Sequence, residues 1–416
     1  MTAPTTAPPA ARLDGDRHVD HVVTSGLSLA GLDVHPAVVL APMAGVTNRA
    51  FRALCREQSS AGLAEVGDMS ASHAGPPGLF VCEMVTSRGI VERQAKSLGM
   101  LQFDPAEPVR SVQLYGVDPH YLAEATRIVC GDFGVGHVDL NFGCPVPKVT
   151  RKGGGAALPV KRNLVAQILQ RTVAAAAPFG ARVTVKTRIG IDDAHPTHLD
   201  TGRIAEESGV VAIALHARTA EQHYSGTARW EAITELVQAL TIPVLGNGDI
   251  WEADDAVRMV RETGCAGVVV GRGCLGRPWL FRDLARALAG GEMHAPSLPR
   301  LVEVAAVMRR HAELLTALMG EDKGLRDFRK HVSWYLKGFE VGGEIRAAGG
   351  MVSTLADLDA VLARIDGSQS FPVTEIRQPR GRQGSARRVV LPQGWFDDTD
   401  GRGLDLSEAE DDTSGG

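Results

Sequence analysis

The chain of 416 residues lacks the features of membrane, secreted and metal-bound proteins. No stretch approaches the roughly 18 consecutive apolar residues of a membrane-spanning helix. The amino terminus has no apolar core behind basic residues, so it does not resemble a secretion signal. The six cysteines are scattered without a C-x-x-C pair, which argues against disulfides and zinc and suits a reducing compartment. We therefore expect a cytoplasmic protein with no membrane anchor and no metal.

The charge balance lacks a strong excess of either sign. A formal net charge of −5 excludes a protein coated in positive charge, although a local basic groove can still bind a polyanion. The apolar and charged fractions, 44% and 22%, are ordinary for a soluble protein. The length leaves room for one large domain and a smaller one.

What the sequence does have is one repeated pattern, an apolar β-branched run with a polar or glycine-bearing end, followed by helical spacing. The runs are Val38–Pro42, Leu79–Glu83, Val109–Leu114, His137–Phe142, Arg182–Thr187, Val211–His216, Pro243–Gly246 and Gly267–Val270. Eight such units over roughly 250 residues predict a (β/α)8 TIM barrel, placed at 28–295 after a disordered leader at 1–27. An open doubly wound sheet has the same local rhythm and is the alternative fold.

The remaining segments divide into a helical part and a tail. Helical spacing at Arg300–Gly320, Lys323–Phe339 and Thr354–Ile365 predicts a small C-terminal helical domain over 296–368. Arginines followed by an acidic stretch predict a disordered charged tail over 369–416, and a solvated tail is favoured over an RNA-binding arm. Glycine, proline and serine between Glu65 and Gly78 predict a loop or insertion before the second strand.

The last two predicted strand ends indicate a phosphate site. Asn247-Gly248-Asp249 and Gly271-Arg272 offer backbone N–H groups, and glycine allows a phosphate to approach closely. The loops after the seventh and eighth strands are the usual phosphate site of a TIM barrel. We expect a phosphate-bearing cofactor there.

Three other strand ends carry polar side chains that leave alternatives open. Lys186 could be a Schiff-base nucleophile, a phosphate ligand or a cation beside an electron-rich ring such as a flavin. Gln113 could donate hydrogen bonds to the pyrimidine edge of the same ring and accept them from it, or its amide could only cap a loop. His216 could hold phosphate or substrate, or be bonded locally.

Cys144 is the candidate catalytic residue. Gly143 and Pro145 flank it just past the fourth predicted strand, in a turn that would present the thiol to the barrel mouth. The thiol could act as a nucleophile or as an acid, and an ordinary thiol keeps its proton near neutrality. Lys148, Arg151 and Lys152 follow in a basic, glycine-rich loop, which could be a solvated face or could hold nucleic-acid phosphates.

Taken together, these segments resemble the tRNA-dihydrouridine synthases. The resemblance runs from about residue 28 to 365, and Arg329–Tyr335 is similar to the bacterial B-type subgroup. The motifs that carry it are Ala41–Arg49 with Phe51 and Arg52, Asn141–Pro145, Lys148-Val149, Arg151-Lys152, Val185–Gly190, His216–Thr219, Gly246–Ile250, Gly271-Arg272 and Gly276–Trp279.

The resemblance implies an FMN-bound barrel that uses NADPH to reduce uridine in tRNA, in the D-loop by expectation. Hydride would pass from flavin N5 to uracil C6, and Cys144 matches the family's proton donor to C5. The residues implied to hold FMN are Pro42, Met43, Ala44, Gln113, Lys186, His216, Asn247, Gly248, Asp249, Gly271 and Arg272. Those expected to contact tRNA are Lys148, Arg151, Lys152, Arg188, Arg326, Arg329, Lys330 and Lys337.

Two other functions are compatible with a barrel of this kind. A flavin barrel could reduce a free pyrimidine or another small conjugated substrate, but such a substrate would not need the helical domain or the basic loop. An RNA-binding scaffold without catalysis is the more distant alternative, and the presence of Cys144 and Lys186 speaks against it.

Overall fold

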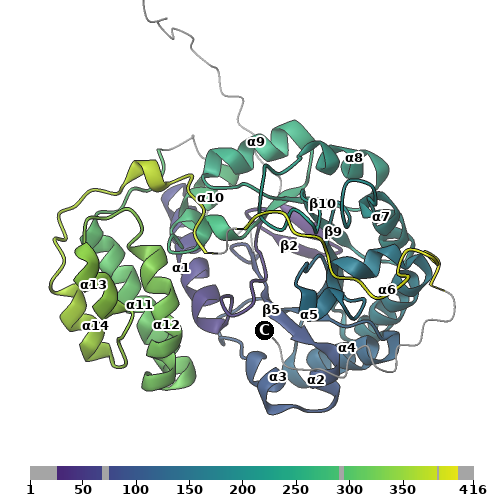
Figure 1. Cartoon of the computed structure of the whole chain (residues 1–416), viewed down its shortest axis with the longest axis horizontal. Helices are drawn as coiled ribbons and strands as arrows, with labels where there is room; N and C mark the ends of the chain where they lie inside the picture. Colours follow the sequence, from purple (N-terminus) through teal and green to yellow (C-terminus); the bar gives the residue numbers. More distant parts are fainter. Residues whose placement is uncertain (1–25, 68–74, 290–294, 382–383, 402–416) are drawn as a thin grey trace, which may run out of the picture.

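The fold is a closed parallel barrel with a helical domain at its side (Figure 1), seen in a computed structural model that describes residues 26–67, 75–289, 295–381 and 384–401. The strand order is β4-β3-β11-β10-β9-β8-β7-β6-β5, and β4 and β5 follow one another in the chain. The strands are β3 (Val38–Leu40), β4 (Leu79–Phe80), β5 (Cys82–Thr86), β6 (Ser111–Tyr115), β7 (His137–Phe142), β8 (Arg182–Arg188), β9 (Ala212–His216), β10 (Val244–Asn247) and β11 (Gly267–Val270).

Pairing of β11 with β3 distinguishes the barrel from the open sheet. Val268 lies opposite Val38 in this parallel pair, so the last strand joins the first. The second predicted run is split between β4, which pairs with β3, and β5, which pairs with β6. The predicted (β/α)8 barrel is confirmed, and the doubly wound sheet is excluded.

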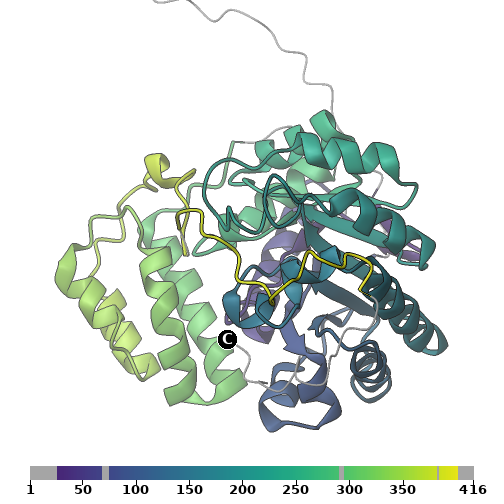
Figure 2. The same ribbon diagram turned by 45° about the vertical axis from the view of Figure 1, so that its right-hand side comes forward.

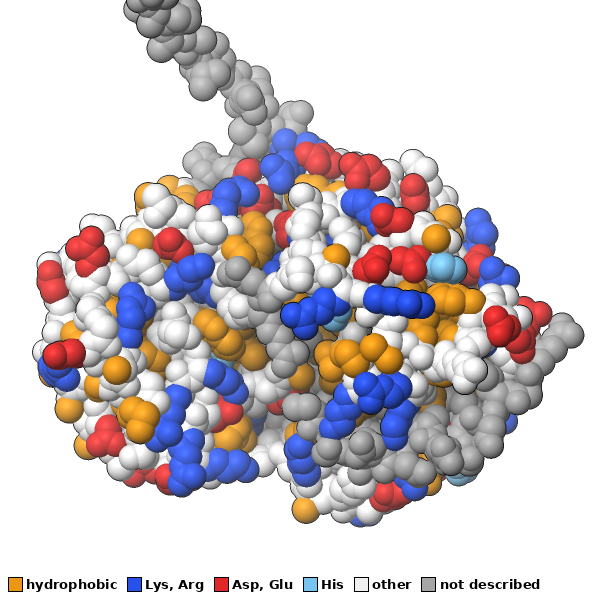
Figure 3. Space-filling model, in the orientation of Figure 1, with side chains coloured by type: hydrophobic (Ala, Val, Ile, Leu, Met, Phe, Trp, Pro, Cys, Tyr) orange, Lys and Arg blue, Asp and Glu red, His pale blue; other side chains and the backbone are white. Residues whose placement is uncertain are grey.

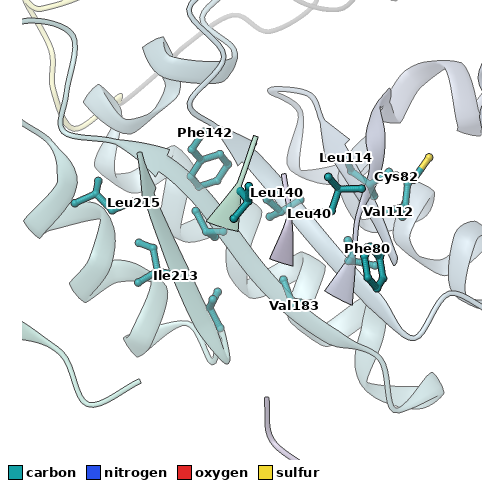
Figure 4. Close-up of a cluster of buried hydrophobic side chains, with 14 of the residues drawn as sticks. Leu40, Phe80, Cys82, Val112, Leu114, Leu140, Phe142, Val183, Ile213 and Leu215 are labelled. Atoms are coloured by element: carbon teal, nitrogen blue, oxygen red, sulfur yellow. The ribbon is translucent and has the colours of Figure 1, made fainter. Parts of the chain in front are cut away.

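Apolar side chains fill both faces of the barrel wall because strand residues alternate between the two sides. Leu40, Leu140 and Leu215 belong to the larger cluster beneath the helices, part of which Figure 4 shows. The outer helices are α1 (Arg49–Glu65), α2 (Ser87–Val91), α3 (Ala95–Met100), α4 (Pro119–Phe133), α6 (Arg162–Ala176), α7 (His198–Glu207), α8 (Glu231–Ala239), α9 (Ala253–Thr263) and α10 (Leu280–Leu288).

A short hairpin precedes the barrel and was not predicted. Its strands, β1 (Leu27–Leu29) and β2 (Leu32–Val34), pair antiparallel and bury Leu27 and Leu29 against a cluster that contains Val39 and Leu245. Leu27 therefore belongs to the folded part, while residues 1–25 of the predicted leader lie outside the described residues. The same holds for 68–74 within the predicted loop at Glu65–Gly78.

The helical domain contains α11 (Leu301–Met319), α12 (Glu321–Tyr335), α13 (Gly342–Gly349) and α14 (Leu355–Leu362). The helical spacing predicted α11, α12 and α14, whereas α13 was missed. Phe51 of α1 contacts this domain, since its ring centroid lies 5.5 Å from that of His311 and 5.9 Å from that of His331. Of the helices within the described ranges, none is long and apolar enough to cross a membrane.

The prediction of a disordered tail over 369–416 is wrong for 369–381 and 384–401, the part that the structure describes. Phe371 is buried in the core of the helical domain, and Arg377 forms an ion pair of 3.1 Å with Asp255 at the start of α9. Further on, Trp395 is 7% exposed. Figures 1 and 2 show this segment, in yellow, passing from the helical domain across the barrel. A few large side chains anchor it despite its low apolar content.

A buried ion pair fixes the loop that follows β3. The side chains of Arg52 and Glu107 are 0% and 3% exposed and lie 3.0 Å apart. Arg52 also donates to the carbonyl oxygen of Thr47 at 2.9 Å, and the Thr47 hydroxyl accepts a hydrogen bond from the Met43 backbone N–H at 3.0 Å. The pair therefore holds α1 and the residues at the barrel mouth together.

Removing Glu107 should cost much more stability than removing an exposed partner. Glu107→Ala leaves the Arg52 guanidinium buried without its counter-ion, which typically costs about 3–5 kcal/mol. Asp132→Ala is the control, because Asp132 pairs with Arg93 on the surface, where the loss is at most about 1 kcal/mol. Urea titrations of both variants measure the free energy of unfolding. Equal losses would show that the buried pair does not stabilise the fold.

Candidate active site

A cleft opens at the carboxyl ends of the strands, on the side of β10 and β11. It is lined by Ala41, Pro42, Met43, Lys186, His216, Tyr224, Asn247, Gly248, Asp249, Ile250, Trp251, Val269, Gly271, Arg272 and Gly273. Most residues predicted to hold the cofactor are in this lining. Ala44 and Gln113 are not, and Tyr224 and Trp251 are additions that sequence reasoning missed.

One end of the cleft is shaped for an anion. Gly248 has a φ of +130°, and a Cβ there would lie 2.7 Å from the Cβ of Ala228, so the position requires glycine. Arg218 Nη2 bonds both carboxylate oxygens of Asp249 at 2.8 Å. Arg218 Nη1 is buried and has no hydrogen-bond partner among the described residues. An unpaired guanidinium N–H beside a glycine turn suits an anionic oxygen.

Arg272 adds a second guanidinium to the same end. It lies over the ring of Tyr224, 4.7 Å from its centroid, and 5.3 Å from the ring centroid of Trp251. Arg218 lies in the His216–Thr219 motif that carries the family resemblance, but the sequence does not indicate its role. Tyr224 and Trp251 follow strand ends in loops, where no local pattern distinguishes them.

The carboxylate of Asp249 is paired with groups of the protein itself. Its carboxylate accepts from Arg218 and from the Ala228 backbone N–H at 2.8 Å, so it orients the arginine and the loop after β9. A carboxylate turned toward a phosphate would repel it, whereas here its charge is offset by Arg218. The backbone of Asp249, at a φ of +56°, completes the tight turn after β10.

Lys186 lies at the centre of the cleft. Its Nζ donates to Asn247 Oδ1 at 3.0 Å, and Asn247 Nδ2 donates to the Val269 carbonyl at 2.7 Å, which fixes the orientation of the amide. Burial lowers the pKa of Lys186 to about 8, and the charge of Arg188 acts in the same direction, while Asp139 opposes both. The lysine is therefore a cation at neutral pH that can lose its proton in mild base.

His216 is uncharged at neutral pH. Burial lowers its pKa well below the ordinary value, and the positive charges of Arg188 and Lys186 lower it further. A neutral imidazole can donate one hydrogen bond to a ligand without adding to the crowded positive charge of the cleft.

A chain of hydrogen bonds connects the barrel interior to Cys144. Gln113 Nε2 donates to Asp139 Oδ2 at 2.7 Å, and Asn141 Nδ2 donates to Gln113 Oε1 at 2.8 Å. Asn141 Oδ1 accepts from the backbone N–H of Cys144 at 2.9 Å. These hydrogen bonds fix the orientation of the side-chain amides of Gln113 and Asn141. Asn141 lies in the Asn141–Pro145 motif but the sequence does not indicate this role, and Asp139, within a buried strand, gives no local signal at all.

The Cys144 loop is held from two sides. Arg188 Nε donates to the Gly143 carbonyl at 2.8 Å, and the Ala156 backbone N–H donates to the Cys144 carbonyl at 3.0 Å. Cys144 is half-buried, whereas the other five cysteines are buried. Burial raises the pKa of Cys82 and of Cys130 to about 11, which keeps these thiols protonated. Cys144 is thus the thiol that a substrate can reach.

Arg188 does not lie on the surface, contrary to the expectation that it contacts tRNA. It is 4% exposed, and its Nη1 donates to the carbonyl oxygens of Thr219 and His223 at 2.9 Å each. These bonds, with the one to Gly143, join the loops after β7 and β9. Arg188 is therefore a structural cation beneath the Cys144 loop.

The other cations expected to contact tRNA lie on two elements. Lys148, in α5 (Pro147–Thr150), and Arg151 are exposed, and Lys152 is half-buried. On α12, Arg326 is exposed, but Arg329 donates to the carbonyls of Val352 and Met351 and thereby ties α12 to the end of α13. Figure 3 shows lysine and arginine side chains on both the barrel and the helical domain.

Lys330 reaches from the helical domain to the barrel mouth. Its Nζ donates to Asp327 at 2.6 Å and lies 3.9 Å from the place that a Cβ of Gly45 would take, in the loop after β3. Lys337 is held by the Pro379 carbonyl at 3.0 Å. Within the described residues, no group of three or more His, Cys, Asp or Glu side chains is arranged to hold a metal.

Comparisons with known proteins agree with this architecture. Residues 39–369 match the family model of dihydrouridine synthase (Dus). A protein named probable tRNA-dihydrouridine synthase from Mycobacterium tuberculosis (strain CDC 1551 / Oshkosh) is 54% identical over 375 residues, which covers 90% of this chain and 93% of the relative.

Two relatives carry the B-type name. tRNA-dihydrouridine synthase B of Xanthomonas axonopodis pv. citri (strain 306) is 37% identical over 81% of this chain and 94% of its own. The protein of the same name from Pseudomonas aeruginosa is 38% identical over 79% and 91%. The resemblance seen in the sequence, including the B-type subgroup, is confirmed: the chain belongs to the dihydrouridine synthase family of oxidoreductases.

Proposed function

We propose that the protein is an FMN-dependent tRNA-dihydrouridine synthase that reduces the C5–C6 double bond of uridine in tRNA with NADPH. The observation that carries the proposal is the convergence of Lys186, the anion-binding end of the cleft and the accessible Cys144 thiol at one barrel mouth. Family membership and the names of the relatives support tRNA as the substrate.

The residues present fit FMN. The unpartnered Nη1 of Arg218 and the glycine turn at Gly248 would receive the phosphate, together with Gly271 and Arg272. Lys186 would supply positive charge to the N1–C2 edge of the ring. The hydrogen-bonded Gln113 would face the pyrimidine edge, and Pro42, Met43 and Ala44 would line the ring. When bound, FMN supplies the hydride for uracil C6.

Cys144 would supply the proton for C5. The Asn141 bond to its backbone and the Arg188 bond to Gly143 hold the loop that carries this half-buried thiol. Burial lowers the pKa of Arg188 to about 10, and the attraction between Cys144 and this guanidinium opposes part of that shift. The same attraction would stabilise the thiolate that remains after the proton has moved to C5.

The tRNA would lie across the barrel mouth and the helical domain at 296–368. Lys148, Arg151 and Lys152 on one side, with Arg326 and Lys330 on the other, would contact backbone phosphates. The target base must leave its stack to reach Cys144, which costs a few kcal/mol that these contacts would offset. Arg188 and Arg329 would shape this surface from within.

The substrate can be tested directly. Purified holoenzyme with NADPH should convert uridines of unmodified tRNA to dihydrouridine, measured by mass spectrometry of the digested RNA, and leave free uracil largely unreacted. Comparable efficiency on free uracil would overturn the tRNA assignment. Protein that cannot take up flavin would overturn the cofactor.

Cys144→Ala should separate the two halves of the reaction. The variant should bind FMN and oxidise NADPH at the wild-type rate but reduce tRNA about 10²–10⁴-fold more slowly, the usual loss for a general acid. Stopped-flow absorbance of the flavin measures both steps. Cys130→Ala, at a buried position on α4, is the control and should react normally. Unchanged turnover in Cys144→Ala would remove this thiol from the chemistry.

FMN affinity should weaken as the pH rises through about 8. Lys186 carries its positive charge below its pKa of about 8 and loses it above, so attraction to the cofactor decreases in mild base. Fluorescence titration of the apo-protein with FMN between pH 6.5 and pH 9.5, conditions that span this value, measures the effect. Lys186→Met should bind FMN more weakly and without this pH step, and a variant that retains the step would exclude Lys186 as its source.

A further inference from the structure

The segment after the helical domain lies against the loops of the active site. We call residues 384–401 the strap. Its Arg387 backbone N–H donates to the Glu221 carbonyl at 2.9 Å in the loop after β9, and Phe396 stacks on His195 in the loop after β8 with ring centroids 4.0 Å apart. Figures 1 and 2 show the strap crossing this side of the barrel. Barrel chemistry does not in itself require such a segment.

Trp395 is the main anchor of the strap. Its indole Nε1 donates to the Ala157 carbonyl at 2.9 Å, and Lys161 Nζ lies 4.5 Å from its ring centroid. A Cβ on Gly153 would fall 2.4 Å from the indole ring, so the ring lies directly against this glycine. Trp395 shares a small apolar cluster with Ala156, Ala157, Val160, Ile191, Ala220 and Val389.

The turn beneath Trp395 also supports Cys144. The Ala156 backbone N–H donates to the Cys144 carbonyl at 3.0 Å. A Cβ on Gly155 would lie 2.5 Å from that carbonyl oxygen and 3.1 Å from the Cys144 Cβ. Gly153, Gly154 and Gly155 thus lie between the indole on one side and Cys144 on the other. Three consecutive glycines have more backbone freedom than any other tripeptide, so a ring packed on them restricts the conformations of the turn.

We propose that Trp395 is a positioning residue for Cys144: by packing on the glycine turn, it keeps the thiol within reach of uracil C5. The proposal rests on the proposed function of Cys144 as proton donor. Without the indole, the turn would sample other conformations and the thiol would move. A displacement of about 1 Å can cost on the order of 10²-fold in rate.

The experiment compares three variants of the full-length holoenzyme. Trp395→Ala removes the ring, Trp395→Phe keeps a ring but loses the bond to Ala157, and Phe396→Ala removes the neighbouring aromatic anchor, which touches the loop after β8. Phe396→Ala is therefore the matched control for general loosening of the strap. Each is reduced with NADPH and then reoxidised with saturating unmodified tRNA while flavin absorbance is followed.

Trp395→Ala should slow reoxidation by tRNA about 10- to 100-fold, because the acid is misplaced. Its reduction by NADPH and its KM for tRNA should stay at the wild-type values. Trp395→Phe should show a smaller loss, and Phe396→Ala little change. A raised KM for tRNA or slower reduction by NADPH in all three variants alike would indicate a general structural role and overturn the inference.

A second readout reports on the thiol itself. Alkylation of Cys144 by iodoacetamide, followed by peptide mass spectrometry, should become faster in Trp395→Ala than in Phe396→Ala, since the loop opens only in the first. Wild-type rates of both alkylation and reoxidation in Trp395→Ala would overturn the inference. If that variant does not fold, equal rates in Trp395→Phe and Phe396→Ala overturn it instead. Full base reduction by Cys144→Ala would contradict the proposed function rather than this inference.

Discussion

Pairing of β11 with β3 closes the sheet and places the loop after the first barrel strand beside the loop after the last one. It places the carboxyl ends of all the parallel strands around one rim, so residues more than two hundred positions apart become neighbours. The bond between Lys186 and Asn247 joins β8 to β10, and the bond between Asn141 and Gln113 joins β7 to β6. These two bonds join strands that are close in the sheet order, whereas the approach of Gly271 to Ala41 and Met43 depends on the closure.

The rim concentrates positive charge that must be compensated. Lys186, Arg188 and Arg272 are largely buried, and burial together with neighbouring cations lowers the pKa of each. The carboxylate of Asp139 offsets part of the charge of Lys186, and that of Asp249 is paired with Arg218. His216 contributes none, because its pKa is driven well below neutrality. The remaining excess suits an anionic cofactor, which would complete the electrostatic balance of the mouth.

Structural cations and functional cations are distinguished by their partners. Arg188 and Arg329 donate to backbone carbonyls, so they tie loops and helices together. Arg218 has both characters. Its Nε donates to the Ser225 carbonyl, as in a structural cation, but its Nη1 has no partner among the described residues. Arg151 is exposed on the basic loop. A sequence shows only that each residue is basic, because the partner that decides its role comes from a distant part of the chain.

The sequence by itself predicted the repeated strand–helix units, the helical segment and, through the family resemblance, most of the residues that line the cleft. It did so because strand periodicity and the small or polar residues at strand ends are local patterns. Only the tertiary structure decided that Arg188 is buried, that the Asp249 carboxylate pairs with Arg218, and that the C-terminal segment folds back so that Trp395 packs on the glycine turn that follows Cys144. A single tryptophan in a polar segment gives no periodic signal. Its burial depends on a glycine turn far earlier in the chain, and only the folded chain brings the two together.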